Sequence, residues 1–205
     1  MIKTTQSLLK ELDTYRTPSM KIKRMVKAGE LYVVKRGFYE TDRSCPPAYL
    51  SGVIYGPSYL SFEYALSVYG LIPERVDVFT AATLRKNRSK RFSNTFGHYS
   101  YRDIPESAFP YGITVRTEGE YAWLMATPEK ALCDLLYVKQ SIDNTSDLEG
   151  LLFDSLRIEE DDFDELDREQ LLFLSERYKS SHLRILKRYV EEKNEQSDSG
   201  HARAI

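Results

Sequence analysis

The densest cluster of chemically useful side chains in the 205-residue sequence is a run of positive charge. Residues 85–91 hold five basic side chains in seven positions: Arg85, Lys86, Arg88, Lys90 and Arg91. Guanidinium and ammonium groups at this density bind phosphates, so the run predicts contact with nucleic acid or with a protein that handles it. The alternative is an exposed connection between strands whose charges only keep a sheet edge soluble.

Aromatic residues close to this run could stack on bases: Phe92, Phe96, Tyr99 and Tyr101. Base stacking on aromatic rings is typical of proteins that bind single strands. However, alternating aromatics in a hairpin more often pack within a sheet, and we favour packing here.

The residues offer little support for catalysis. Three histidines lie far apart, without the paired spacing of a zinc site: His98, His182 and His201. The carboxylates of residues 159–164 lack the alternate spacing and the glycine of a calcium loop. There is no glycine-rich phosphate loop, Gly-x-Ser-x-Gly elbow or Cys–His pairing. We therefore expect no catalytic residue, metal or cofactor, and an enzymatic alternative would have to use carboxylates near Asp77 or Asp103.

The N-terminal segment predicts a small basic head. Residues 6–15 form one expected helix and residues 17–28 a second, which ends at Gly29. Strands are expected at 31–34 and 38–40, around a basic turn. Helix, glycine and basic hairpin follow one another as in a winged helix, although too few residues precede Thr17 for a full one. The predicted DNA contacts are the basic residues of the second helix and the turn: Lys21, Lys23, Arg24, Lys27, Lys35 and Arg36. The alternative is an ordinary solvated helix face.

Two further stretches read as capped amphipathic helices. Ser61 is the expected N-cap of the first, which ends at Gly70. Thr127 is the expected N-cap of the second, with Pro128 at its first helical position. Within that second helix, Lys130 and Asp134 lie one turn apart and predict a surface ion pair.

The rest of the chain predicts an α+β architecture. Residues 48–53 could be helical. Residues 75–81 form a β-rich run, and hairpins are expected at 92–101 and 113–125, which together make a mostly antiparallel sheet with flanking helices. Leucine-rich helical segments follow residue 146, interrupted by an acidic connector at 159–167.

Charge is distributed unevenly along a chain whose net charge is −2. Residues 1–41 carry +5, residues 42–142 carry +1, and residues 143–198 carry −9. A basic front suits polyanions, and an acidic rear suits a basic protein. We divide the chain into a basic winged-helix-like head (1–48), an α+β core (49–142), an acidic helical region (143–194) and a flexible tail (195–205).

Composition indicates a globular cytoplasmic protein. Hydrophobic residues make up 41% and charged residues 29% of the chain. No apolar run is long enough to span a bilayer, and the N-terminus has no signal-peptide core. Cys45 and Cys133 form no disulfide framework, and Cys133 is expected to be a small core residue.

The motif "YLS-x-x-x-ALS-x-YGLIPE" at residues 59–74, followed by "ATPEKALxDLLY" at 126–137, resembles the AbiE-type antitoxin family. Residues 29–39 also resemble the wing segment of that family, so the resemblance covers roughly residues 17 to 140. It implies a winged-helix DNA-binding head, an α+β antitoxin domain, and a nucleotidyltransferase toxin from the same operon as the partner. On this reading, the basic run 85–91 would contact nucleic acid or the toxin.

Taken together, these features predict a non-catalytic antitoxin of an abortive-infection operon that also binds operator DNA and regulates its own transcription. The alternatives are a ligand-responsive transcriptional regulator without antitoxin activity and a degenerate nucleic-acid-processing enzyme. The residues do not determine the oligomeric state, the operator, or whether the toxin is masked directly.

Overall fold

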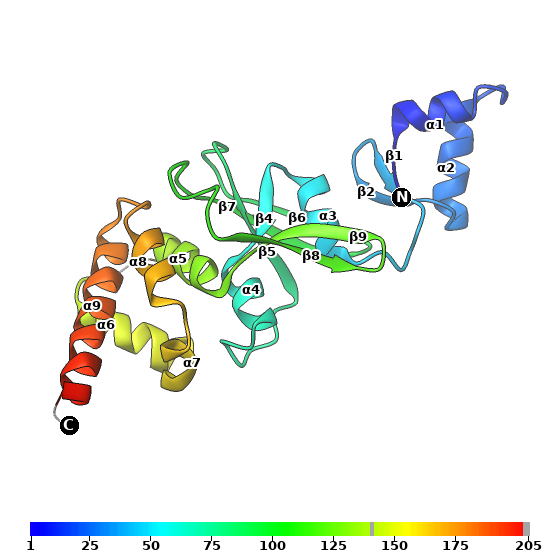
Figure 1. The fold of residues 1–205 in the computed structure, drawn as a ribbon. Helices are drawn as coiled ribbons and strands as arrows, with labels where there is room; N and C mark the ends of the chain where they lie inside the picture. Colours follow the sequence, from blue (N-terminus) through cyan, green and yellow to red (C-terminus); the bar gives the residue numbers. More distant parts are fainter. Residues whose placement is uncertain (140–141, 203–205) are drawn as a thin grey trace.

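The computed structural model describes residues 1–139 and 142–202, and of residues 195–202 only the helical backbone. The chain builds an elongated molecule with a small head at one end, a sheet-containing body in the middle and a helical region at the other end (Figure 1). Among the described residues, no helix is both long and apolar enough to cross a membrane.

The head combines two helices with a three-stranded sheet. Its elements are β1 (Ile2–Thr4), α1 (Thr5–Glu11), α2 (Pro18–Ala28), β2 (Tyr32–Lys35) and β3 (Phe38–Glu40). The strand order is β1-β3-β2, and both pairings are antiparallel. Leu8, Ile22 and Leu31 form a separate small core. Both predicted helices and both predicted strands are present, and Gly29 ends α2 in the left-handed conformation, as expected. The sequence does not predict β1, because its pairing partner β3 lies far along the chain and no adjacent strand or turn marks it.

The body is built on a six-stranded sheet. Its elements are α3 (Pro47–Ile54), β4 (Ser58–Leu60), α4 (Phe62–Val68), β5 (Val78–Thr83), β6 (Lys90–Asn94), β7 (Gly97–Asp103), β8 (Ile113–Glu118), β9 (Tyr121–Ala126) and α5 (Pro128–Val138). The strand order is β6-β7-β5-β4-β9-β8. Helix α3 covers one face, where it accepts hydrogen bonds from Tyr99 and Tyr101, and α4 lies on the face that carries Thr80.

This sheet is more mixed than the sequence predicted. Three of its pairings are antiparallel, but β4 pairs with β9, and β5 with β7, in parallel. The strand that brings the two halves together is β4, and all three of its residues are buried. A three-residue strand buried throughout has no alternation of buried and exposed positions, so local pattern does not predict it.

The helical region packs on α5 and shares the core of the body. Its elements are α6 (Thr145–Glu149), a π-helical segment (Gly150–Ser155), α7 (Glu160–Asp164), α8 (Arg168–Ser175) and α9 (Ser181–Ala202). Every residue from Glu129 to Leu136 of α5 is buried, because the body covers one side of this helix and α8 and α9 the other. The acidic stretch predicted as a connector contains α7. Helix α9 continues through most of the predicted tail, and residues 203–205 lie outside the described part of the chain.

The head is joined to the body by a hydrogen-bonded aspartate. The carboxylate of Asp42 accepts hydrogen bonds from Ser44, through its amide (2.8 Å) and its hydroxyl (2.6 Å), and from the Tyr121 hydroxyl of β9 (2.7 Å). The Ser44 and Tyr121 hydrogen bonds lower the pKa of Asp42 to about 2. Because the folded-state pKa lies below the ordinary value, this contact stabilises the fold above about pH 4 and is lost as the pH falls towards 2.

Replacing Tyr121 with phenylalanine is expected to raise the pKa of Asp42 towards its ordinary value, because one of the donors to the carboxylate is removed. A carboxyl-carbon NMR titration of wild type and variant measures this shift. Tyr39→Phe is the matched control, since the Tyr39 hydroxyl makes no hydrogen bond to Asp42, and it should leave the titration unchanged. An unaltered Asp42 titration in Tyr121→Phe would contradict the assignment.

Candidate nucleic-acid interface

The predicted DNA contacts of the head divide into an exposed set and an internal set. Ile22 of α2 is 4% exposed and faces the head core, whereas Lys23, Arg24 and Lys27 on the same helix are exposed. Arg36 is exposed in the turn between β2 and β3. These four side chains give the head a cationic surface that faces solvent.

Lys21 and Lys35 make contacts within the protein. The Lys21 ammonium lies 5.6 Å from the ring centroid of Tyr15. Lys35 Nζ donates to the Ile54 carbonyl of α3 (3.2 Å) and lies 4.3 Å from the centre of the Phe38 ring. Burial lowers the pKa of Lys35. Lys35 therefore fastens the head to the body and belongs to a different surface from Lys23, Arg24 and Lys27.

The basic run 85–91 is a shaped loop between β5 and β6. Asp103 of β7 organises it, because its Oδ2 accepts from the amides of Lys86 (2.6 Å) and Asn87 (2.5 Å), and its Oδ1 accepts from the Thr83 hydroxyl (2.6 Å). The side chains then diverge. Arg85 forms a two-pronged ion pair with Glu106, with its closest contact at 2.5 Å.

The remaining cations of the loop point in different directions. The ammonium groups of Lys86 and Lys90 lie 5.1 and 5.4 Å from the Tyr55 ring centroid. Arg88 is exposed in the loop, and Arg91 is exposed on β6. The run therefore does not act as a single clamp, and only Arg88 and Arg91 face solvent without an aromatic ring or carboxylate against them in the described structure.

Removing the Asp103 carboxylate should loosen this loop. In Asp103→Ala the amides of Lys86 and Asn87 lose their acceptor, so we expect their hydrogen exchange to accelerate at least tenfold, given about 1.5–3 kcal/mol for a hydrogen bond to a charged group. Asp77→Ala is the control, because Asp77 is exposed and its ion pair among the described residues is with Arg75. Unchanged exchange at both amides would refute this role.

The sheet register creates a basic groove that the sequence reading did not find. Alternate residues of β7 divide between the two faces: Tyr99 and Tyr101 are buried against α3, while His98 and Arg102 lie on the opposite face. Arg91 of β6 is the register partner of Ser100 of β7, so its side chain lies on the same face as those of His98 and Arg102. With Arg75 from the loop before β5, these residues line a groove of about 640 Å³. The alternation of polar and aromatic residues along 98–102 is the sequence feature that could have indicated this groove.

The groove contains one internal ion pair. Both terminal nitrogens of Arg102 donate to Glu63 of α4 (3.2 and 2.7 Å), and its guanidinium lies 4.6 Å from the Phe62 ring centroid. Arg75 and Arg91 supply the more exposed positive charge. Tyr99 and Tyr101 are buried, and their hydroxyls donate to carbonyls of α3, which agrees with the packing interpretation.

A buried polar network joins the two stretches that carry the family resemblance. Asp134 of α5 accepts from Tyr59 (2.9 Å), Ser61 (2.6 Å) and Tyr178 (2.6 Å), and its Oδ1 lies 3.1 Å from Lys130 Nζ. Lys130 Nζ also donates to the Ala108 carbonyl (2.8 Å) and to the Tyr178 hydroxyl (2.5 Å). Burial lowers the pKa of Lys130 and, together with the charge of Asp134, raises those of Tyr59 and Tyr178.

This network corrects two predictions. Lys130 and Asp134 form a fully buried pair, each with 0% exposure, and not a surface pair. Ser61 occupies the N-cap position of α4, as predicted, but its side chain makes no capping hydrogen bond, because its hydroxyl donates to Asp134. Thr80 supplies the cap instead, by accepting from the Tyr64 amide (3.0 Å). Thr127, in contrast, caps α5 as predicted. The side chains of this network are buried, and their contacts tie α5 to Tyr59 of β4 and to Tyr178.

The other candidate chemical residues are dispersed. His98 pairs with Ser93, and His182 contacts the Leu136 carbonyl at 3.1 Å, while the side chain of His201 lies outside the described part. Asp77 is exposed, and Asp103 holds the basic loop. No group of three or more His, Cys, Asp or Glu side chains among the described residues is arranged to hold a metal ion.

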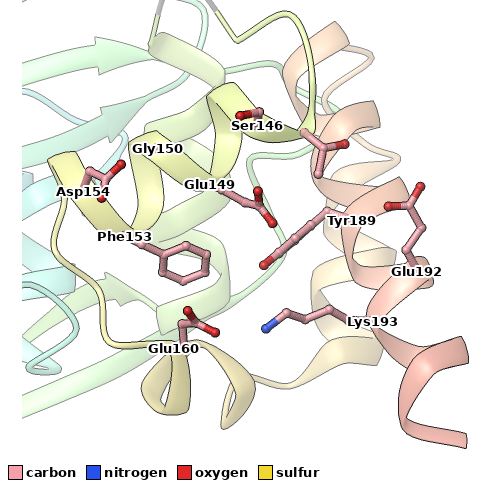
Figure 2. Close-up of a pocket in the computed structure, with 10 residues that line it drawn as sticks. Ser146, Glu149, Gly150, Phe153, Asp154, Glu160, Tyr189, Glu192 and Lys193 are labelled. Atoms are coloured by element: carbon pink, nitrogen blue, oxygen red, sulfur yellow. The ribbon is translucent and has the colours of Figure 1, made fainter.

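An acidic groove lies at the opposite end of the molecule from the head. It measures about 530 Å³ and opens between α6, the π-helical segment, α7 and α9. Figure 2 shows Glu149, Glu160 and Tyr189 facing one another across it, with Phe153 and Lys193 beside them. Asp154 and Glu192 add further carboxylates, so acidic groups outnumber the one lysine. Lys193 is itself engaged with Asp164 at 3.1 Å.

Comparison with protein-family models finds no match to this chain, and no curated protein matches it. The assignment of function therefore depends on the motifs and on the surfaces described above.

Proposed function

We propose that this protein is a cytoplasmic antitoxin of the AbiE type that acts by binding macromolecules, with DNA at its head and a basic nucleotidyltransferase toxin at its acidic end. The observation that carries the proposal is the separation of charge in space. Helix α2, which carries the exposed cations, and the helices α6, α7 and α9, which enclose the acidic groove, lie at opposite ends of one elongated molecule (Figure 1). Two partners of opposite charge could therefore bind at the same time.

The DNA half of the proposal is supported by the geometry of α2. The helix is anchored through Ile22 and presents Lys23, Arg24 and Lys27 outwards, so it can approach phosphates without disturbing the head core. In a gel shift with the promoter of its own operon, the complex should weaken steeply with rising salt, because each phosphate contact releases counterions. Absence of any complex at low salt would refute DNA binding.

The toxin half is supported by the acidic groove, whose exposed carboxylates complement the basic surface that an RNA-handling enzyme presents. We expect the double charge reversal Glu149→Lys/Glu192→Lys to weaken co-purification with the protein encoded next to this chain by at least about tenfold, since two complementary charges become repulsive. Affinity capture after co-expression measures the loss.

Glu169→Lys is the matched control, because Glu169 is an exposed acid on α8 that does not line the groove. It should retain wild-type capture. If wild type rescues cells from the neighbouring protein without any co-purification, neutralisation is indirect and the groove is not the toxin site.

A further inference from the structure

The basic groove, which Arg75, Arg91 and Arg102 line, takes part in neither half of the proposed function. Its charged lining residues are these three arginines and Glu63, so positive charges outnumber the single negative one. A surface of this sign attracts anions. The volume of about 640 Å³ lies within the roughly 300–1,000 Å³ of clefts that hold small organic ligands, and a lone inorganic anion would leave most of it unfilled.

The three arginines differ in how firmly they are already held. Arg91 is exposed and makes no hydrogen bond or ion pair within the described part of the chain. The ion pair of Arg75 with Asp77 (3.4 Å) joins side chains that are 93% and 81% exposed, so water screens it. Arg102 is bound by Glu63 through both terminal nitrogens. Two of the three cations are therefore available to a ligand, and the third already holds a carboxylate.

The strand register places Arg91 and Arg102 close enough to share one ligand. Arg91 is the register partner of Ser100, and Arg102 lies two residues further along β7 on the same face. Residues at such diagonal positions lie roughly 7–8 Å apart, a gap that two arginine side chains and one phosphate group can bridge. The planar guanidinium group matches the geometry of phosphate oxygens as well as that of the Glu63 carboxylate.

The rest of the lining suits an organic ligand with a flat ring. Val76 and Val78 give apolar surface, and Val78 is 37% exposed although it is hydrophobic. The Ser100 hydroxyl has no hydrogen-bond partner within the described residues, and the exposed His98 uses only Nδ1, in its contact with Ser93 (2.9 Å). Hydroxyl and imidazole groups can donate to or accept from the polar atoms of a base and a sugar. An acyl chain, in contrast, would find only two valines.

We propose that this groove binds a nucleoside phosphate, with its phosphates on the three arginines and its base against Val76 and Val78. The phosphates compete with the Glu63 carboxylate for Arg102, so the affinity is set by the balance between these two anions. The site does not depend on the proposed antitoxin function, because neither the α2 face nor the acidic groove contributes to it.

Calorimetric titration of the full chain with ATP, GTP, CTP and UTP measures the affinity, with EDTA present so that no metal ion contributes. At least one nucleotide should bind with a Kd of about 1 mM or tighter. Arg91→Ala should weaken that binding by at least about tenfold, the effect of one hydrogen bond to a charged group. Its circular dichroism spectrum should not change, because Arg91 is exposed. Arg24→Ala is the matched control, since Arg24 is an exposed arginine of the head, and it should bind as wild type does.

Glu63→Gln tests the competition, and a histidine signal tests the location. The substitution keeps the shape of the side chain but removes the competing charge, so it should tighten nucleotide binding by about threefold or more. In proton NMR spectra the imidazole signals of His98, which lines the groove, should shift during the titration. Those of His182 should not, because its ring contacts the Leu136 carbonyl of α5.

Two further probes separate a nucleoside phosphate from other anions. Inorganic tripolyphosphate carries the charge without the base and should bind more weakly than the best nucleotide. Oligouridylate, a single strand, should not displace that nucleotide at equal phosphate concentration. The proposal is wrong if no nucleotide binds saturably, if Arg24→Ala weakens binding as much as Arg91→Ala, if Glu63→Gln loosens it, or if either probe matches or exceeds the nucleotide in affinity.

Discussion

Replacing Asp134 with alanine is expected to lower the free energy of unfolding by about 3–5 kcal/mol, which is the usual cost of removing one partner of a buried ion pair. The variant leaves the Lys130 ammonium buried without its carboxylate and removes the acceptor of the Tyr59, Ser61 and Tyr178 hydroxyls. Urea denaturation followed by circular dichroism measures the change. The loss should exceed that of any exposed carboxylate.

Two further variants separate this explanation from a general loss of packing. Asp143→Ala removes an exposed carboxylate next to the helical region and should change stability by less than about 0.5 kcal/mol. The double variant Lys130→Met/Asp134→Leu replaces both charges by apolar groups and should recover much of the loss, as replaced buried pairs often do. If Asp134→Ala costs less than about 1 kcal/mol, the network is not the structural joint described here.

Reversing the charge of the α2 face should have the largest effect on DNA binding. The triple variant Lys23→Glu/Arg24→Glu/Lys27→Glu removes three phosphate contacts, so the slope of log affinity against log salt should fall by about 3. Stability should change little, because these side chains are exposed and the packing of Ile22 is retained. Promoter gel shifts at several salt concentrations measure the slope.

A single pair of variants controls for net charge. Arg24→Glu and Arg184→Glu change the charge of the whole protein equally, and both arginines are exposed on helices. Only Arg24 lies on the head, so only Arg24→Glu should weaken the complex. Equal effects of the two substitutions would mean that DNA senses overall charge, and the assignment of α2 as the contact helix would fail.

The buried network gives a physical account of why two stretches far apart in the sequence form one motif. Tyr59 lies within the central strand β4, and Ser61 immediately precedes α4. Lys130 and Asp134 lie one turn apart on α5. Their polar groups satisfy one another inside the core. Any change at one position therefore leaves a buried partner unpaired at another, which links the two segments energetically.

Local pattern was sufficient for the elements whose faces differ in polarity. Helix α2 carries apolar residues on one side and basic residues on the other, and the hairpin β8–β9 is joined by Gly119 and Glu120, so both were predictable from neighbouring residues. The caps at Gly29 and Thr127 depend on residues within the same turn, and they were predicted for the same reason.

Such local patterns do not predict which distant segments of the chain pair with one another. The mixed sheet order depends on β4, whose three residues are all buried, and the cap of α4 comes from Thr80, which lies on a different strand. The basic groove requires Arg75, Arg91 and Arg102 to be brought together by the register of β5, β6 and β7.

By itself, the sequence determined most of the helices, the hairpins, the basic front and the acidic rear, because these depend on local periodicity and on charge counts. Only the tertiary structure decided which cations remain exposed, that Lys35 fastens the head to the body, and that Lys130 and Asp134 are buried together. Burial and partnership are properties of side chains that meet in space, and helical spacing alone does not distinguish an ion pair in water from one in the core.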